Sequence, residues 1–114
     1  MKLYEERSAG RIRRGLDRLV MRWPGVRSDE LFGCPAYRAD GTIFAVLTTG
    51  AVALTRLPDD KRDELKRSFQ TRPFGSGERN IGRWVNVRVD DNGDLERLLP
   101  YLEESYKHAL GGRT

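Results

Sequence analysis

The sequence contains very few of the residues on which most catalytic and metal sites depend. Among its 114 residues there are one cysteine and one histidine. A single cysteine excludes a disulfide within the chain, and one histidine beside one cysteine leaves no ligand set for a His/Cys metal centre. No apolar run approaches the roughly 20 residues that cross a bilayer, and the first residues lack the apolar core of a signal peptide. We therefore expect a cytoplasmic protein without a bound metal.

Residues 1–114 are enough for one domain and no more. A chain of this length hides roughly two thirds of its extended surface on folding, so it builds a real core without disulfides. Apolar residues make up 38% of the chain and charged residues 33%. This composition is polar for a globular domain but not poor enough in apolar residues for disorder.

Positive charge is concentrated in the first quarter of the chain. The whole chain carries a formal charge of +4, whereas residues 1–28 alone carry +5 and the remainder −1. A basic segment on a nearly neutral body is typical of proteins with an acidic partner, nucleic acid above all. Most of the basic residues are arginine, which forms bidentate contacts with phosphate.

The first segment predicts an amphipathic helix that ends at Pro24-Gly25. Its apolar residues recur at helical spacing, and five arginines recur at similar spacing on the nearly opposite face. The apolar set is Ile12, Leu16, Leu19, Val20 and Trp23, and the basic set is Arg7, Arg11, Arg14, Arg18 and Arg22.

The next block predicts an antiparallel meander of three strands. Asp40-Gly41 and Thr49-Gly50 are tight-turn pairs, and they separate Glu30–Ala39, Thr42–Thr48 and Ala51–Arg56. Because proline cannot donate to a ladder, Pro35 should lie in an edge strand or at a bulge.

The second half predicts a short helix from Pro58, a strand fragment with a long hairpin loop over residues 70–82, and a last strand, Arg83–Val89. A final helix starts after Asp91, is kinked by Pro100 and ends at Gly111-Gly112. The order α-β(3)-α-β(2)-α is an α+β fold with an antiparallel sheet, and we expect the first and last helices on one face of it.

Turn and core motifs suggest a family relationship. They are Leu31-Phe32-Gly33, Tyr37-Arg38-Ala39-Asp40-Gly41, Ile43-Phe44-Ala45, Ala53-Leu54, Pro73-Phe74 and Leu102-Glu103-Glu104-Ser105-Tyr106. Over roughly residues 20–110 the chain resembles the TfoX N-terminal domain family and the related MmcQ/YjbR family. The resemblance implies a two-layer antiparallel fold shared with type III secretion chaperones. It also implies an association with DNA binding or gene regulation, since TfoX is a competence regulator, and it implies no catalytic residue.

The residues that carry chemistry do not form a catalytic constellation. Cys34 has no histidine or second cysteine near it and is interpreted as a small buried hydrophobe. His108 suits the C-terminus of the last helix, and Gly75-Ser76-Gly77 lacks the Lys-Ser/Thr ending of a phosphate-binding loop. The adjacent acid pairs do not face each other on a helix. We therefore predict a protein that is not an enzyme and needs no cofactor.

One hypothesis is a regulatory module that binds DNA or another polyanion without sequence preference. Its arginines would come from the first helix and from the surroundings of the long loop: Arg7, Arg11, Arg14, Arg18, Arg22, Arg72, Arg79 and Arg83. A solvated helix face would give the same pattern of charge.

The second hypothesis is a protein-interaction or homodimer module. If Ile43, Ala45 and Leu47 face the helices, strand alternation places Phe44, Val46 and Trp84 together on the opposite face. An apolar sheet face of this kind needs cover from a second copy, a partner protein or a helix. The sequence alone does not choose between the two hypotheses.

Overall fold

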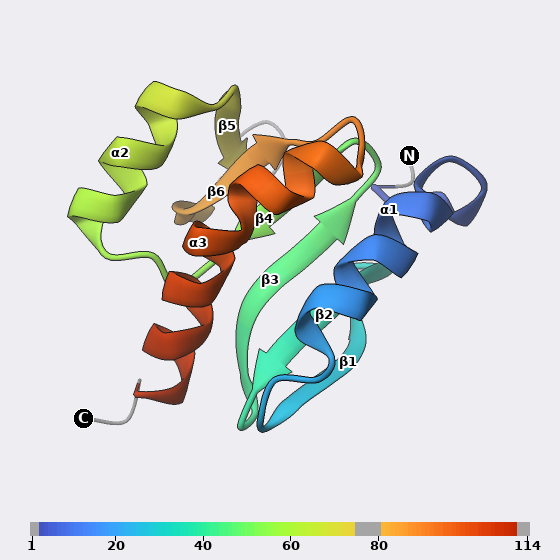
Figure 1. The fold of residues 1–114 in the computed structure, drawn as a ribbon, viewed down its shortest axis with the longest axis horizontal. Coiled ribbons are helices and arrows are strands. Elements are labelled where there is room, and N and C mark those ends of the chain that lie inside the picture. Colours follow the sequence, from blue (N-terminus) through green and yellow to red (C-terminus); the bar gives the residue numbers. More distant parts are fainter. Residues whose placement is uncertain (1–2, 75–80, 112–114) are drawn as a thin grey trace.

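A six-stranded antiparallel sheet and three helices make up the fold in a computed structural model, which describes residues 3–74 and 81–111 (Figure 1). The sheet has the order β1-β2-β3-β4-β6-β5. Its strands are β1 (Val26–Leu31), β2 (Cys34–Ala39), β3 (Thr42–Thr48), β4 (Ala51–Leu54), β5 (Thr71–Phe74) and β6 (Ile81–Arg88). The helices are α1 (Glu6–Val20), α2 (Asp59–Ser68) and α3 (Asn92–Leu110). The predicted α+β class and antiparallel sheet are confirmed.

The meander has four strands before α2, where the sequence predicted three. The predicted strand Glu30–Ala39 is divided by a tight turn between β1 and β2. Phe32 and Gly33 both adopt positive φ, 55° and 77°, as the two central residues of a type I′ turn do. Phenylalanine is not typical of that position, so the turn was missed. The order is therefore α-β(4)-α-β(2)-α.

Pro35 lies in an inner strand, but at this position β2 is paired with only one of its two neighbouring strands. It lies opposite Glu30 of β1, whereas the pairing of β2 with β3 begins only at Ala36 and Val46. The missing N–H of Pro35 therefore costs the sheet no bond to β3.

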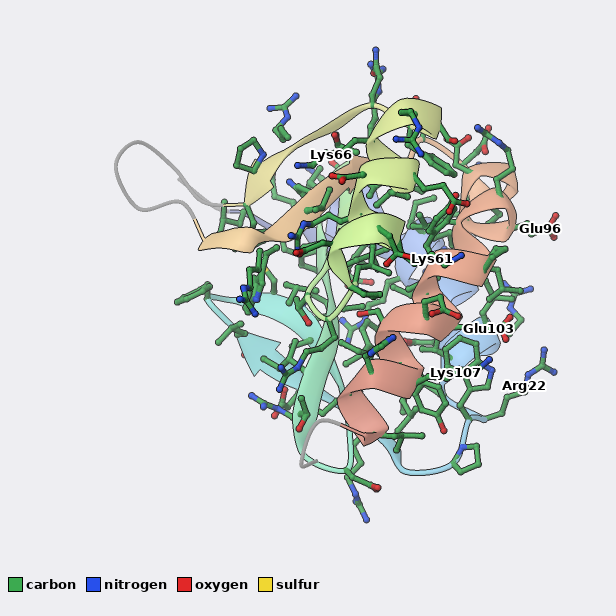
Figure 2. The ribbon with its side chains drawn as sticks, turned by 90° about the vertical axis from the view of Figure 1, so that its left-hand side faces the viewer. Arg22, Lys61, Lys66, Glu96, Glu103 and Lys107 are labelled. Carbon is green, nitrogen blue, oxygen red and sulfur yellow. The ribbon has the colours of Figure 1, made fainter. Side chains whose placement is uncertain are left out.

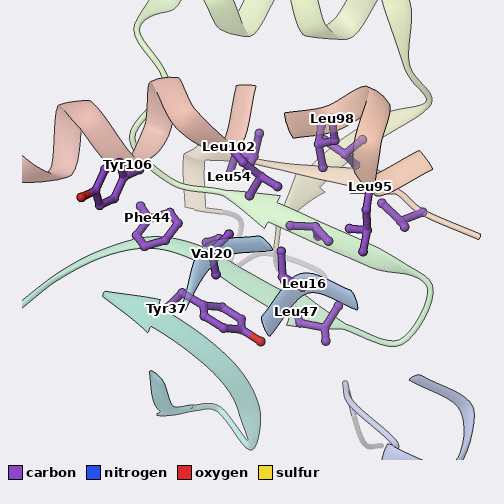
Figure 3. Packing of buried hydrophobic residues seen from close by; sticks show 14 of the residues in the cluster. Leu16, Val20, Tyr37, Phe44, Leu47, Leu54, Leu95, Leu98, Leu102 and Tyr106 are labelled. Carbon is purple, nitrogen blue, oxygen red and sulfur yellow. The ribbon is translucent and has the colours of Figure 1, made fainter. Parts of the chain in front are cut away.

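All three helices lie on the same side of the sheet (Figure 2). α1 and α3 place their apolar stripes on one continuous core with the sheet, in which Leu16, Val20, Leu98 and Leu102 are fully buried (Figure 3). Each such side chain contributes about 1.5–3 kcal/mol relative to full exposure. This packing fixes which face of α1 points outward.

Gly15 allows α1 to approach the start of α3 closely. A Cβ atom at this position would lie 2.0 Å from Oδ1 of Asn92 and 3.2 Å from Cδ1 of Leu95, so an alanine here would require the Asn92 side chain to move. The glycine weakens the helix by about 1 kcal/mol relative to alanine.

A bulge in β3 changes which side chains face the helices. Tyr37 pairs with Ala45 and Arg38 pairs with Ile43, so Phe44 is an extra residue in β3. Phe44 and Ala45 consequently both lie in the helix-covered core, while Ile43 packs on the other face. The prediction that Phe44 shares a face with Val46 and Trp84 is wrong, because simple alternation does not continue through a bulge.

The outer face of the sheet, opposite the helices, has a small core of its own. The outer cluster consists of Cys34, Ala36, Val46, Ala53 and Phe74, all of them buried. The half-buried side chains against it come from β1, β3 and β6 and from Tyr4, which precedes α1. One of them, Trp84, meets the Phe74 ring edge-on at 5.2 Å. In the described residues no helix takes part in this cluster.

α3 bends about midway along its length (Figure 1). Pro100 lies inside this 19-residue helix, where it removes one backbone hydrogen bond and its ring crowds the preceding turn. Neither α3 nor any other helix within residues 3–74 and 81–111 is long and apolar enough to cross a membrane.

Candidate nucleic-acid interface

The five arginines of the first segment form a continuous exposed row. We call Arg7, Arg11, Arg14, Arg18 and Arg22 the α1 arginine row; every member is exposed. The first four lie within α1, and Arg22 lies in the turn just after the helix ends at Val20. The predicted helix extended to Pro24-Gly25, so it ends earlier than expected. At 1.5 Å per residue, the helical part of the row is roughly 16 Å long.

The row makes no ion pair or side-chain hydrogen bond with the part of the chain that the structure describes. Arg13, on the same helix, behaves differently: it is half-buried and pairs with Glu6 at 3.1 Å. Glu6 also accepts a 2.5 Å hydrogen bond from the Tyr4 hydroxyl. The hydrogen bonds from Tyr4 and then Arg13 lower the pKa of Glu6, with a smaller electrostatic effect from Arg14. Glu6 thus borders the row but is held by other groups.

Asp17, the other acid in α1, is turned toward the sheet. Its Oδ1 accepts a 2.5 Å hydrogen bond from the hydroxyl of Tyr37 in β2. Burial, and then the hydrogen bond to Asp17, raise the pKa of Tyr37, so this phenol stays protonated and continues to donate. The carboxylate of Asp17 is therefore directed into the fold and forms no ion pair with the arginines of the row.

Two hollows lie along the row, and α3 lines one of them. One, of about 350 Å³, is lined by Arg7, Arg11 and Arg14 together with Asp90, just before α3. The other, of about 280 Å³, lies between α1 and α3 and is lined by Arg18, Arg22 and Glu96. Figure 2 shows Arg22 and Glu96 on the helical side of the molecule. Three acids, Glu6, Asp90 and Glu96, thus border the positive surface, which contains five arginines.

The structure does not gather all the predicted arginines into one surface. Arg72 lines a hollow of about 610 Å³ on the outer side of the sheet. Arg83 lines another, of about 560 Å³, with Trp84, Arg38 and Arg56. Arg79 lies outside the described residues. Asp90 lines both the hollow of Arg72 and the one beside Arg7.

Arg88 is a basic residue at this end that the sequence did not single out. Its Nε donates to Asp90 at 3.2 Å, and its Nη1 donates to the side-chain oxygen of Gln70 at 3.0 Å. Alternation in the last strand places Arg88 with Asn86 on the outer face. Arg88 and Asn86 come near Arg72 only through the pairing of β5 with β6, which the sequence does not specify.

The predicted interaction face is largely internal. Phe44 and Val46 are completely buried within this one chain, on opposite sides of the sheet. Trp84 is half-buried against the outer cluster. Of these three residues, Trp84 alone retains surface that another molecule could touch.

Cys34 and His108 are placed as ordinary structural residues. Cys34 is buried, its Sγ–H donates weakly to the Phe32 carbonyl at 3.7 Å, and burial raises the pKa of its thiol. A raised pKa disfavours the nucleophilic thiolate. His108 lies 3.7 Å from Glu104 on the surface of α3. Within residues 3–74 and 81–111 there is no group of three or more acidic, histidine or cysteine side chains that could hold a metal ion.

No family model, curated protein or solved structure matches the chain. The resemblance to the TfoX N-terminal and MmcQ/YjbR families therefore stays a prediction.

Proposed function

We propose that this protein is a small, non-catalytic nucleic-acid-binding domain in which the α1 arginine row contacts the phosphates of a duplex. The observation that carries the proposal is the row itself: five exposed arginines with no ion pair among the described residues, on a helix whose own acids are held by other groups. Opposite charges three or four residues apart on a helix attract each other by about 0.2–0.5 kcal/mol. A row without such pairs is available to an external polyanion.

The fold holds the row in place before a ligand arrives. Ile12, Leu16 and Val20 are anchored in the core, and Gly15 fits against Asn92 at the start of α3. The helical part of the row, roughly 16 Å long, spans several phosphates, because a duplex strand carries one about every 3.4 Å along its axis. Phosphate contacts position a protein without reading bases, so binding should be weak and tolerant of sequence.

The finer fold assignment belongs to the same proposal. We infer a two-layer fold of the YjbR/TfoX-N and secretion-chaperone type, located in the cytoplasm. Helices on one side of an open antiparallel sheet support it, as do the sequence motifs over roughly residues 20–110. A regulatory role through DNA is what this resemblance implies.

A protein-interaction or homodimer module is the alternative, and one observation favours it. Phe32 at the tip of the β1–β2 turn is 63% exposed, so its ring is accessible to a partner. A sizing column separates the alternatives, because a homodimer would elute at twice the monomer mass and Phe32→Ser would restore the monomer.

The proposed function is tested with two double variants of equal charge. Arg14→Ala/Arg18→Ala removes two members of the row, whereas Lys66→Ala/Arg67→Ala removes two exposed basic residues of α2. Binding to a labelled duplex of about 20 base pairs is measured by fluorescence anisotropy at low salt. The first variant should bind roughly tenfold more weakly, and the α2 variant should stay close to the wild type. Equal losses in both variants, or no binding by the wild type, would overturn the proposal.

A further inference from the structure

The outer side of the sheet has a polar hollow at the end where β3 turns into β4. It measures about 610 Å³, and Arg72, Arg88, Asn86, Thr49 and Gln70 are among its lining residues. We call it the outer hollow. It lies beside the outer cluster and on the opposite side of the sheet from the core that α1 covers. None of its lining residues belongs to the α1 arginine row.

Strand register explains why there is space here. Thr48, Ala51 and Arg88 are paired across β3, β4 and β6, and Ala53, Asn86 and Arg72 are paired across β4, β6 and β5. The β4 residue is alanine in both rows, but Ala53 is covered by the outer cluster, whereas Ala51 lines the hollow. Because paired side chains stand on the same face, the short side chain of Ala51 leaves a depression between Thr48 and Arg88.

The outer hollow contains arginine groups that no described side chain occupies. Arg72 is exposed and has no ion pair or side-chain hydrogen bond to the residues described here. Arg88 is held on two sides, by Asp90 through Nε and by Gln70 through Nη1. These contacts fix the guanidinium plane and leave its Nη2 unused. Two arginines against one aspartate favour an anion, and guanidinium groups match the oxygens of phosphate in a bidentate manner.

Neutral donors complete the surroundings of such an anion. The Thr49 hydroxyl oxygen accepts a 2.8 Å hydrogen bond from the Glu5 backbone N–H, so its own proton remains free to donate. The Asn86 amide makes no hydrogen bond to a described residue, and its Oδ1 is buried without a partner. Because no described residue holds this amide by a hydrogen bond, it can turn its NH₂ group toward an oxyanion.

We propose that the outer hollow binds a phosphate monoester of nucleotide size, with the phosphoryl group between Arg72 and Arg88. The volume is far larger than a phosphate ion needs and falls in the range of small-molecule sites, roughly 300–1,000 Å³. A free mononucleotide and the 5′-phosphate at the end of an oligonucleotide present the same chemistry. The site does not depend on the α1 arginine row.

The experiment is an NMR titration of the full chain with adenosine 5′-monophosphate, with adenosine as the unphosphorylated control. The nucleotide should shift the backbone amides of Thr49, Arg72 and Arg88, and adenosine should not. Arg72→Gln should weaken binding by about tenfold, as expected for loss of a charge-assisted contact. The matched control is Arg83→Gln, which removes an exposed arginine outside the hollow and should bind like the wild type.

Two further arms define the source and the independence of the site. A short single strand with a 5′-phosphate is compared with the same strand ending in a 5′-hydroxyl. If the phosphorylated strand binds more tightly and this binding depends on Arg72, the site recognises nucleic-acid ends. If only the free nucleotide binds, the site recognises a metabolite. Arg14→Ala/Arg18→Ala should leave nucleotide binding intact even if duplex binding fails. No shifts with the nucleotide, equal shifts with adenosine, or unchanged binding by Arg72→Gln would overturn the proposal.

Discussion

The hydroxyl of Ser105 in α3 donates a 2.7 Å hydrogen bond to the backbone carbonyl of Phe44, the extra residue of the β3 bulge. Ser105 also accepts a 3.1 Å hydrogen bond from the backbone N–H of Arg56, just beyond β4. One buried side chain therefore joins the last helix to the ends of two strands. It supports the bulge that turns the Phe44 ring into the core, where the ring lies 5.6 Å from that of Tyr106.

Replacing Ser105 with alanine should destabilise the fold. The variant leaves the Arg56 N–H without this acceptor and removes one donor to Phe44, and an unsatisfied buried polar group costs about 1–3 kcal/mol. Urea unfolding measures the loss in the free energy of unfolding. Ser28→Ala, at an exposed position of β1, is the control and should change it little. Equal stability of the Ser105 and Ser28 variants would show that the bulge needs no support from α3.

The turn between β1 and β2 should become more stable when Phe32 is replaced with asparagine. Phe32 has φ 55°, a left-handed conformation that costs an ordinary L-residue about 1–2 kcal/mol. Asparagine tolerates this conformation, and Asn-Gly is a favoured type I′ pair. Because the phenyl ring is 63% exposed, little buried surface is lost. We expect a free energy of unfolding about 1 kcal/mol higher, measured with urea; a lower value would mean that the ring makes a stabilising contact.

The fold should lose stability in alkaline solution through Tyr37. Burial and the hydrogen bond to Asp17 raise the pKa of this phenol in the folded state, so the folded chain retains a proton that the unfolded chain releases near pH 10. The stabilisation that Tyr37 gives the folded state is complete below about pH 10. It is lost as the pH rises above that value, by at most about 1.4 kcal/mol per pH unit. Urea unfolding between about pH 9 and 11 should show this decline, and Tyr37→Phe should show a shallower one. Parallel profiles for the two proteins would contradict this assignment.

The features that the sequence predicted are those encoded over a few neighbouring residues. The apolar and basic stripes of α1 follow the helical period, and the valines at 85, 87 and 89 alternate as a strand requires. Both stripes lie where they were expected, one buried and one exposed. The end of α1 was set too late, since Pro24-Gly25 marks a turn that starts beyond the helix.

The features that were missed depend on residues far apart in the chain. The bulge at Phe44 is a matter of the register of β2 against β3, and its carbonyl is bonded by a serine 61 residues later. The outer hollow exists only once β5, β6 and β4 are paired, which places Arg72 beside Asn86. The type I′ turn has a local cause, but Phe32 occupies a position usually taken by asparagine, aspartate or glycine.

The salt dependence of duplex binding tests the central claim, that the α1 arginine row contacts phosphates. Each neutralised phosphate contributes about −0.9 to the slope of log affinity against log salt concentration. If all five arginines take part, the wild type should show a slope near −4.5, and Arg14→Ala/Arg18→Ala should show one about two units shallower. Circular dichroism of both proteins confirms that the variant is folded. A variant with the slope of the wild type, or a wild type that binds no duplex even at the lowest salt, would contradict the account.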